Sequence, residues 1–183
     1  MSYSIIIPTR NEPDLLWTVE NVRRTCNPKQ IIIVYDGAQV IESIPDAVQC
    51  QTPWVTPQGV GRCRDWGIQF TESEYIILLD GHMDFEAGWT DVLIDTCKQN
   101  KNSIVCSRSA SITAGGMKTD KKIISGAHIR YIGAGGMPLE VEWGESCEPG
   151  EIQCCLGACY CMKTSRYFTI GGPCAGAFGW GTS

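Results

Sequence analysis

The chain has 183 residues, which is enough to bury a hydrophobic core as one domain. Hydrophobic residues make up 43% of it and charged residues 19%, a balance that excludes an intrinsically disordered chain. The net charge of -5 argues against nucleic acid as a partner, because nucleic-acid-binding proteins normally carry a basic stripe.

No apolar run approaches the about 20 residues that a membrane span needs, so no span is predicted. The first ten residues lack the pattern of a secretory signal. Eleven cysteines are present, but a disulfide framework is typical of secreted chains shorter than this one. We therefore expect mostly reduced thiols and a cytoplasmic location.

Predicted strands and helices alternate over the first 106 residues. Aliphatic, β-branched runs predict strands, and apolar residues at helical spacing predict amphipathic helices. The expected strands are 3–7, 30–35, 48–50, 75–79 and 103–106, and the expected helices are 14–24, 59–70 and 87–99. The apolar faces of the first and last of these helices are Leu15, Leu16, Val19 and Val22, and Trp89, Val92, Leu93 and Cys97. This alternation predicts an α/β fold with a mostly parallel, doubly wound sheet.

The pattern changes after Cys106, where short alternating strands and glycines replace the long helices. We expect strands at 123–132, 138–143 and 154–162 and one short helix at 164–170. No linker or repeat separates the two parts. The sequence thus predicts a single domain, 1–183, whose first half is 1–106 and whose β-rich second half is 107–183.

Polar loops follow three of the predicted strands. They are Pro8-Thr9-Arg10-Asn11-Glu12, Asp36-Gly37-Ala38 and Asp80-Gly81-His82-Met83-Asp84. The carboxyl ends of parallel strands meet at one edge of a sheet, where ligands bind. Turn formation alone explains any one loop. The three together predict a cation-assisted phosphate site.

The tripeptide Asp80-Gly81-His82 predicts a metal site, because side chains two residues apart in a loop can be directed at one ion. The carboxylate suits hard cations and the imidazole favours transition metals, so the expected ion is Mn²⁺, with Mg²⁺ as the alternative. An equally weighted interpretation makes His82 a solvent-facing turn residue.

The segment 59–67, which contains Arg62 and Arg64, also has two interpretations. It is either the start of a helix that binds phosphate or a plain capped helix with solvated arginines.

These segments resemble the motifs of nucleotide-sugar glycosyltransferases of the GT-A fold, of a family-2-like type. The resemblance rests on Ser4-Ile5-Ile6-Ile7-Pro8-Thr9-Arg10-Asn11-Glu12, Ile31-Ile32-Ile33-Val34-Tyr35-Asp36-Gly37-Ala38, Cys63-Arg64-Asp65-Trp66-Gly67 and Tyr75-Ile76-Ile77-Leu78-Leu79-Asp80-Gly81-His82. The family usually has D-x-D, whereas Asp80-Gly81-His82 is similar to the D-x-H of polypeptide N-acetylgalactosaminyltransferases. Gly88-Trp89, Arg62-Cys63-Arg64 with Gly67, and Gly179-Trp180-Gly181 resemble further motifs of those enzymes.

The resemblance implies a metal-dependent transfer of a sugar from a nucleoside diphosphate sugar, here a UDP-sugar, to an unknown acceptor. It makes 1–106 the nucleotide-binding half and 107–183 the half for the acceptor and donor sugar. The implied donor-site residues are Pro8, Thr9, Arg10, Asn11, Glu12, Asp36, Gly37, Arg62, Arg64, Asp80, Gly81 and Gly157. Asp80 and His82 would hold the metal, which would act on the diphosphate leaving group, while Trp180 would lie near the donor sugar and acceptor. By analogy, D-x-H favours retention of the anomeric configuration.

Three alternatives remain open at this stage. Relatives have an acidic residue just after the Trp-Gly that aligns with Trp180-Gly181, and inverting members use such a residue as a base. Its absence here supports a non-catalytic, or truncated, sugar-nucleotide binding module. A nucleotidyltransferase is disfavoured, because its glycine-rich loop would follow the first strand. The third alternative is a structural zinc site that uses four of Cys147, Cys154, Cys155, Cys159, Cys161 and Cys174. These cysteines lack the C-x2-C pairs that are typical of zinc sites. They are equally well explained as small buried residues of a β-rich core.

Overall fold

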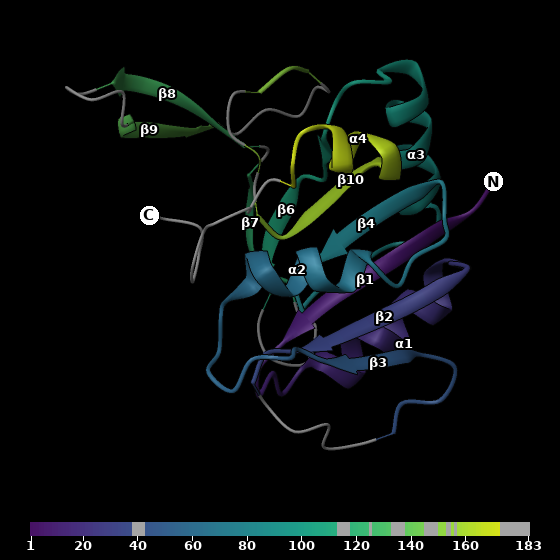
Figure 1. Ribbon diagram of the computed structural model, residues 1–183. Helices are drawn as coiled ribbons and strands as arrows, with labels where there is room; N and C mark the ends of the chain where they lie inside the picture. The colour runs from purple at the N-terminus through teal and green to yellow at the C-terminus, as the bar shows by residue number, and fades with distance from the viewer. Residues whose placement is uncertain are drawn as a thin grey trace.

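The computed structural model describes residues 1–37, 43–112, 118–124, 126–132, 138–144, 150–152, 155 and 157–172. Its main sheet has six strands in the described residues, in the order β3-β2-β1-β4-β10-β5 (Figure 1). They are β1 (Tyr3–Thr9), β2 (Gln30–Tyr35), β3 (Val48–Gln51), β4 (Tyr75–Leu79), β5 (Val105–Cys106) and β10 (Cys159–Lys163). The helices are α1 (Leu15–Thr25), α2 (Val60–Ile68), α3 (Trp89–Gln99) and α4 (Thr164–Thr169). The predicted α/β class is confirmed.

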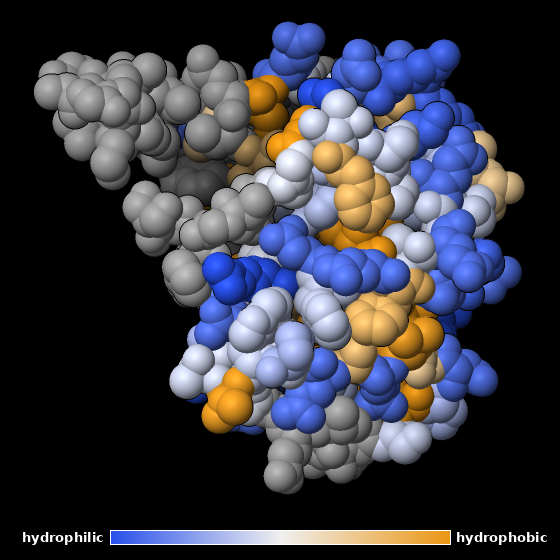
Figure 2. Space-filling model, viewed as in Figure 1, coloured by the Kyte–Doolittle hydropathy of each residue, from blue (hydrophilic) through white to orange (hydrophobic). Residues whose placement is uncertain are grey.

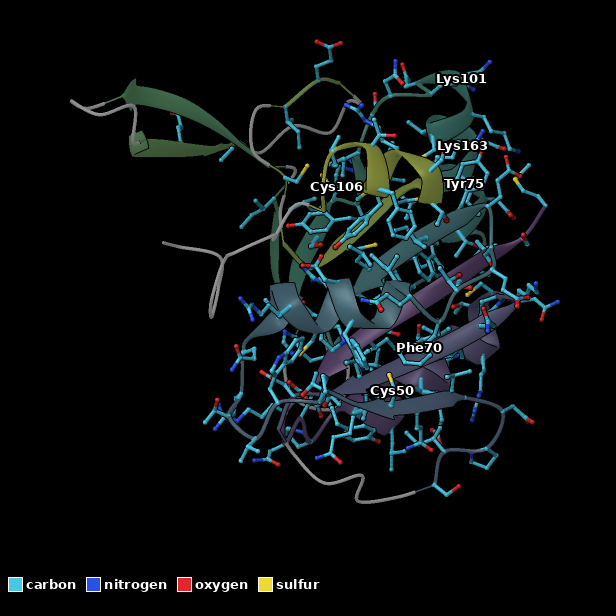
Figure 3. All side chains as sticks on the ribbon, viewed as in Figure 1. Cys50, Phe70, Tyr75, Lys101, Cys106 and Lys163 are labelled. Carbon is cyan, nitrogen blue, oxygen red and sulfur yellow. The ribbon has the colours of Figure 1, made fainter. Side chains whose placement is uncertain are left out.

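Strands β1 to β4 of the first half pair in parallel, as the alternation predicted. The strand from the second half, β10, is inserted between β4 and β5 and runs antiparallel to both. Lys163 at its end consequently lies opposite Tyr75 at the start of β4 (Figure 3). The second half of the chain therefore completes the sheet of the first half.

Helices cover both faces of this sheet, giving three layers (Figure 1). One core cluster joins α1 and α3 to Ile5, Ile7, Ile31, Ile33, Ile77 and Leu79, and the other lies on the α2 and α4 side around Ile6, Ile32, Val34, Ile76 and Leu78. Successive residues of β1, β2 and β4 thus point into different cores, which explains why these strands are apolar throughout. Burial on both faces fixes the sheet as the rigid frame of the site.

Two predicted face assignments are wrong. Leu16 is 44% exposed and Val92 is 68% exposed, whereas Leu15 and Leu93 next to them are buried. The buried face of α1 includes the polar Thr18 and Asn21 in place of Leu16, and that of α3 includes Thr90 and Ile94 in place of Val92. Figure 2 shows one face of the molecule, where hydrophobic areas (orange) are interspersed with hydrophilic residues (blue).

Gly67 explains why α2 can lie directly on the sheet. A Cβ atom at this position would come within 2.7 Å of Cγ2 of both Ile6 and Val34. Both of these side chains are fully buried, so neither can move aside. The glycine of the Arg64-Asp65-Trp66-Gly67 motif thus sets the distance between helix and sheet, and with it the position of Arg64.

The remaining described strands form two small antiparallel sheets, β6 (Ser109–Ile112) with β7 (Lys118–Ile124), and β8 (Gly126–Ile132) with β9 (Pro138–Gly144). The β8–β9 ribbon extends away from the main sheet (Figure 1). The single strand predicted at 123–132 is therefore wrong, since β7 ends at Ile124 and β8 starts at Gly126 in another sheet. Gly126 has a φ of 141°, a conformation that few other residues adopt.

Among the described residues, no helix is long and apolar enough to cross a membrane.

Candidate functional site

The carboxyl ends of β1, β2 and β4 meet at one edge of the sheet, as predicted from their polar loops. The backbone N–H of Asp36, after β2, donates to the carbonyl oxygen of Thr9 in β1 at 2.9 Å. His82, after β4, contacts Glu12, after β1. Residues from three separate stretches of sequence are thereby brought to one edge of the sheet.

Asp80 is held by Arg64, which comes from α2. Nη2 of Arg64 donates to Oδ1 of Asp80 and to the carbonyl oxygen of Gly157, both at 3.0 Å. Only 7% of the Arg64 side chain and 18% of the Asp80 side chain are exposed. The guanidinium also lies 5.2 Å from the centre of the Tyr160 ring. Arg64 therefore ties α2, the end of β4 and the start of β10 to one another.

The carboxyl group of Asp80 lies in an environment that disfavours its charge. Burial raises its pKa above the ordinary value, the nearby Arg64 and His82 lower it, and Glu12 raises it. Two carboxyl groups thus share the site with one buried guanidinium. An additional positive charge at this place would be favourable for both carboxylates.

His82 is paired with Glu12 through its Nδ1 atom, which lies 3.0 Å from Oε2 of Glu12. The imidazole is 53% exposed, and because Glu12 occupies Nδ1, Nε2 is the ring nitrogen left for a ligand. Gly81 lies between the two candidate metal ligands, and a Cβ atom there would be 2.8 Å from Cγ of Glu12. A glycine at this position therefore lets Glu12 pack beside the Asp80-Gly81-His82 loop.

Asp36 holds the loop that leads into α2. Its Oδ1 accepts a hydrogen bond from the backbone N–H of Gln58, and its Oδ2 accepts one from that of Gly59, both at 2.8 Å. Asp36 is buried, and Gly37 next to it has a φ of 66° and donates its N–H to Oγ1 of Thr52. Both carboxylate oxygens therefore already bind the start of α2, so any contact of Asp36 with a nucleotide would be additional to this.

The other predicted residues occupy different places. Pro8 is half-buried and Thr9 is buried in β1, whereas Arg10 and Asn11 are exposed. Arg62 points toward the 54–58 loop, where it contacts Gln58 at 3.3 Å and lies 5.7 Å from the Trp54 ring. Trp180 lies outside the described residues.

Two residues of α1 that no sequence motif indicated also bind this edge. Oγ1 of Thr18 donates to the carbonyl oxygen of Gly81 and accepts from the backbone N–H of Met83. Asn21 accepts from the N–H of Phe85 and donates to its carbonyl oxygen. Their signal in the sequence is weak, since it consists only of polar residues at helical spacing beside the apolar stripe.

Asp80 and His82 supply chemistry that suits a divalent cation, namely a carboxylate and an imidazole at one edge of the sheet. No group of three His, Cys, Asp or Glu side chains in the described part of the chain forms a fuller set of ligands. Of the six cysteines considered for the alternative zinc site, Cys155, Cys159 and Cys161 lie in the described residues, and they form no metal-binding group there. The other three cysteines of that set lie outside the described ranges.

The profile of Glycosyl transferase family 2 matches residues 4–134, which is more than half of the chain. This stretch contains β2 to β4, all of β1 except Tyr3, and Glu12, Asp36, Arg64, Asp80 and His82 of the site. The chain belongs to glycosyl transferase family 2. The resemblance inferred from the sequence motifs is therefore confirmed.

Two solved structures place this family 2 chain in the GT-A fold. The crystal structure of GalNAc-T7 with UDP, GalNAc and Mn²⁺ matches with a TM-score of 0.75 and 15% identity, over 98% of this chain and 38% of that one. The crystal structure of S. aureus TarS 1-349 matches with a TM-score of 0.58 and 12% identity, over 93% of this chain and 49% of that one. This chain thus spans less than half the length of either matched chain.

Proposed function

We propose that this protein transfers a sugar from a nucleoside diphosphate sugar, with uridine as the nucleoside, to an acceptor hydroxyl group with the help of Mn²⁺. In such a reaction the bond between the sugar and the diphosphate breaks, a bond to the acceptor oxygen forms, and the acceptor proton leaves. One domain, 1–183, would bind the nucleotide with residues 1–106 and the sugar and acceptor with residues 107–183.

One observation carries this proposal: Asp80 and His82 follow β4 at the sheet edge where the loops after β1 and β2 also end. Parallel sheets bind phosphorylated ligands at this edge. Asp80 belongs to a cluster of two carboxyl groups, one buried arginine and one imidazole. The matched structure of GalNAc-T7 contains UDP, GalNAc and Mn²⁺, which supports the same ligand classes here.

Asp80 and His82 would hold the cation, with Mg²⁺ as the alternative to Mn²⁺. When bound, such an ion supplies Lewis-acid stabilisation of the diphosphate leaving group. Glu12 binds Nδ1 of His82 and so leaves Nε2 for the cation, an arrangement that is common around metal-binding histidines. Arg64 holds the Asp80 carboxylate in place from the protein side.

The remaining donor-site residues would shape the nucleotide pocket. Asp36 fixes the entry to α2 through Gln58 and Gly59, and this places the 54–59 loop beside the edge of the sheet. Pro8, Thr9, Arg10 and Asn11, with Gly37 and Gly81, would line the uridine and ribose. Arg62 would support this pocket, while Gly157 and Trp180 would lie near the donor sugar.

A second candidate is a sugar-nucleotide binding module that does not catalyse transfer. It is favoured by Thr182 and Ser183, which follow Trp180-Gly181 and are not acidic, unlike the base of inverting relatives. This candidate uses the same nucleotide site. The two functions differ in turnover and not in binding.

Measurement of UDP release separates them. The protein would be incubated with Mn²⁺ and each of UDP-glucose, UDP-galactose, UDP-GlcNAc and UDP-GalNAc, and free UDP from transfer or hydrolysis would be measured. We expect release from one of these donors, and its loss in the Asp80→Ala/His82→Ala double variant. Normal turnover by the double variant would contradict the metal roles, and binding without any release would favour the binding module.

A further inference from the structure

The loop that carries His82 is fixed by a buried hydroxyl group on α1. Thr18 is fully buried, and its Oγ1 donates to the carbonyl oxygen of Gly81 at 2.8 Å. The same atom accepts from the backbone N–H of Met83 at 2.9 Å. The first contact fixes the peptide plane before His82, and the second fixes the plane after it.

These two planes determine the backbone conformation of His82, and therefore the direction in which its side chain leaves the loop. Glu12 acts on the side chain itself, because it binds Nδ1. Neither group contacts Nε2. The imidazole is thus held from the backbone by Thr18 and from the ring by Glu12, which leaves Nε2 as the nitrogen for a ligand.

The contacts of α1 continue along the same segment. Asn21 binds both the N–H and the carbonyl oxygen of Phe85, and Oγ1 of Thr25 accepts from Nε1 of Trp89 at 3.1 Å. Positions 18, 21 and 25 lie on one side of a helix, since they are three and four residues apart. The helix therefore fixes residues 81–89 at successive points, starting with Gly81 and Met83 on either side of His82.

We propose that Thr18 is a positioning residue for the cation site, with its hydroxyl group setting the backbone of His82 so that Nε2 and the Asp80 carboxylate are directed at one ion. This inference rests on the proposed function. It assigns no contact between Thr18 and the ion, since the hydroxyl group has already made both of its contacts with the loop.

Three variants test the proposal. Thr18→Val keeps the shape of the side chain but removes the hydroxyl, whereas Thr18→Ser keeps the hydroxyl. Thr90→Val is the matched control. Thr90 is also buried, and its hydroxyl contacts Tyr3 at the start of β1, which is the end of that strand away from the site. The affinity for Mn²⁺ in the presence of UDP would be measured by the electron paramagnetic resonance of free Mn²⁺, alongside thermal unfolding.

We expect Thr18→Val to weaken Mn²⁺ binding by about 10-fold to 100-fold, the usual effect of removing a group that orients a metal ligand. Thr18→Ser is expected to restore the wild-type affinity. Thr90→Val is expected to lower the unfolding temperature without changing the affinity. Wild-type affinity in Thr18→Val, or equal losses in Thr18→Ser and Thr18→Val, would overturn the inference.

Hydrogen exchange of the wild-type protein provides a test that does not depend on the folding of a variant. The Met83 amide is expected to exchange slowly without metal or nucleotide, because Thr18 accepts its hydrogen. Rapid exchange of this amide would overturn the inference by itself. Failure of the wild-type protein to bind Mn²⁺ and UDP would instead overturn the proposed function, while the Met83 result would still report on the Thr18 contact.

Discussion

Oε2 of Glu12 lies 3.0 Å from Nδ1 of His82, although the two residues are far apart in the sequence. The sequence suggested that Glu12 lines a nucleotide pocket and that His82 binds metal as a separate residue. The structure joins them instead. A carboxylate on one nitrogen of an imidazole fixes which nitrogen is free and increases the basicity of the ring toward a metal.

The first prediction concerns this pair. Glu12→Ala is expected to weaken Mn²⁺-dependent UDP binding by about 10-fold, because the imidazole loses its orientation. Titration calorimetry would measure the affinity. Glu72→Ala is the control, since Glu72 is an exposed carboxylate paired with Lys29 away from the site. An unchanged affinity in Glu12→Ala would show that the pairing has no role in metal binding.

The second prediction concerns the buried ion pair of Arg64 and Asp80. Arg64→Met would leave Asp80 beside Glu12 without its counter-charge, so the free energy of unfolding should fall by about 3 to 5 kcal/mol. Urea unfolding would measure this loss. In contrast, Arg24→Met breaks an exposed ion pair with Asp84 and should change stability by less than about 1 kcal/mol.

The double variant Arg64→Met/Asp80→Asn provides the internal check on this second prediction. Because it removes the unpaired charge as well, it should recover part of the stability lost in Arg64→Met. Equal stability of Arg64→Met and wild type, or a further large loss in the double variant, would contradict a stabilising role for the pair.

The third prediction concerns the contact between α2 and the sheet. Gly67→Ala would place a methyl group 2.7 Å from Ile6 and Val34, so we expect a loss of about 1 to 3 kcal/mol of stability from overpacking. Gly150→Ala is the control, because a Cβ atom at that position meets nothing within 4 Å. A Gly67→Ala variant as stable as Gly150→Ala would mean that α2 can move away from the sheet.

The fourth prediction concerns thiol reactivity and its dependence on pH. Cys50 lies on β3 (Figure 3). Burial raises the pKa of Cys50 to about 11 and that of Cys159 to about 12. At pH 7.5 roughly one Cys50 in 3,000 is then a thiolate, and only the thiolate is alkylated. Iodoacetamide should therefore modify both cysteines far more slowly in the folded protein than in urea, with the folded rate for Cys50 rising about tenfold per pH unit below pH 10.

Mass spectrometry of peptides after timed labelling would measure these rates, and equal rates with and without urea at pH 7.5 would contradict the prediction.

The same pKa shifts determine how the stability of the fold depends on pH. The pKa of each thiol is higher in the folded protein than in the unfolded chain, so folding is favoured while the thiols are neutral. This contribution to the free energy of unfolding is fully present below about pH 8.5. It is lost as the pH rises through about 11, and alkaline conditions should destabilise the fold.

The first half of the fold was predictable because each element carries its own local pattern. β1, β2 and β4 are continuous aliphatic runs, and these occur where both faces of a strand are buried. Their parallel pairing was predictable as well, because the predicted helices alternate with the strands and a helical connection joins strands that run in the same direction. The insertion of β10 beside β4 was not predictable, because no local pattern of Cys159–Lys163 specifies its partner strands.

The site was predictable to the extent that it depends on strand ends. Asp80, His82, Glu12 and Asp36 were all selected because they follow strands of one parallel sheet. Their contacts with one another were not predictable, since they depend on loop conformations. Thr18 was missed for a related reason: a threonine in a helix gives no indication that its hydroxyl group binds another segment.

The central claim is that Asp80 and His82 hold a cation to which UDP binds, and calorimetric titration of UDP with and without Mn²⁺ tests it most directly. The wild-type protein and the His82→Ala variant would be compared, with His128→Ala as control because His128 is the other histidine of the chain. We predict that binding requires Mn²⁺, is lost in His82→Ala and persists in His128→Ala. Equal UDP binding by His82→Ala, or no UDP binding by the wild type with any divalent metal, would contradict the claim.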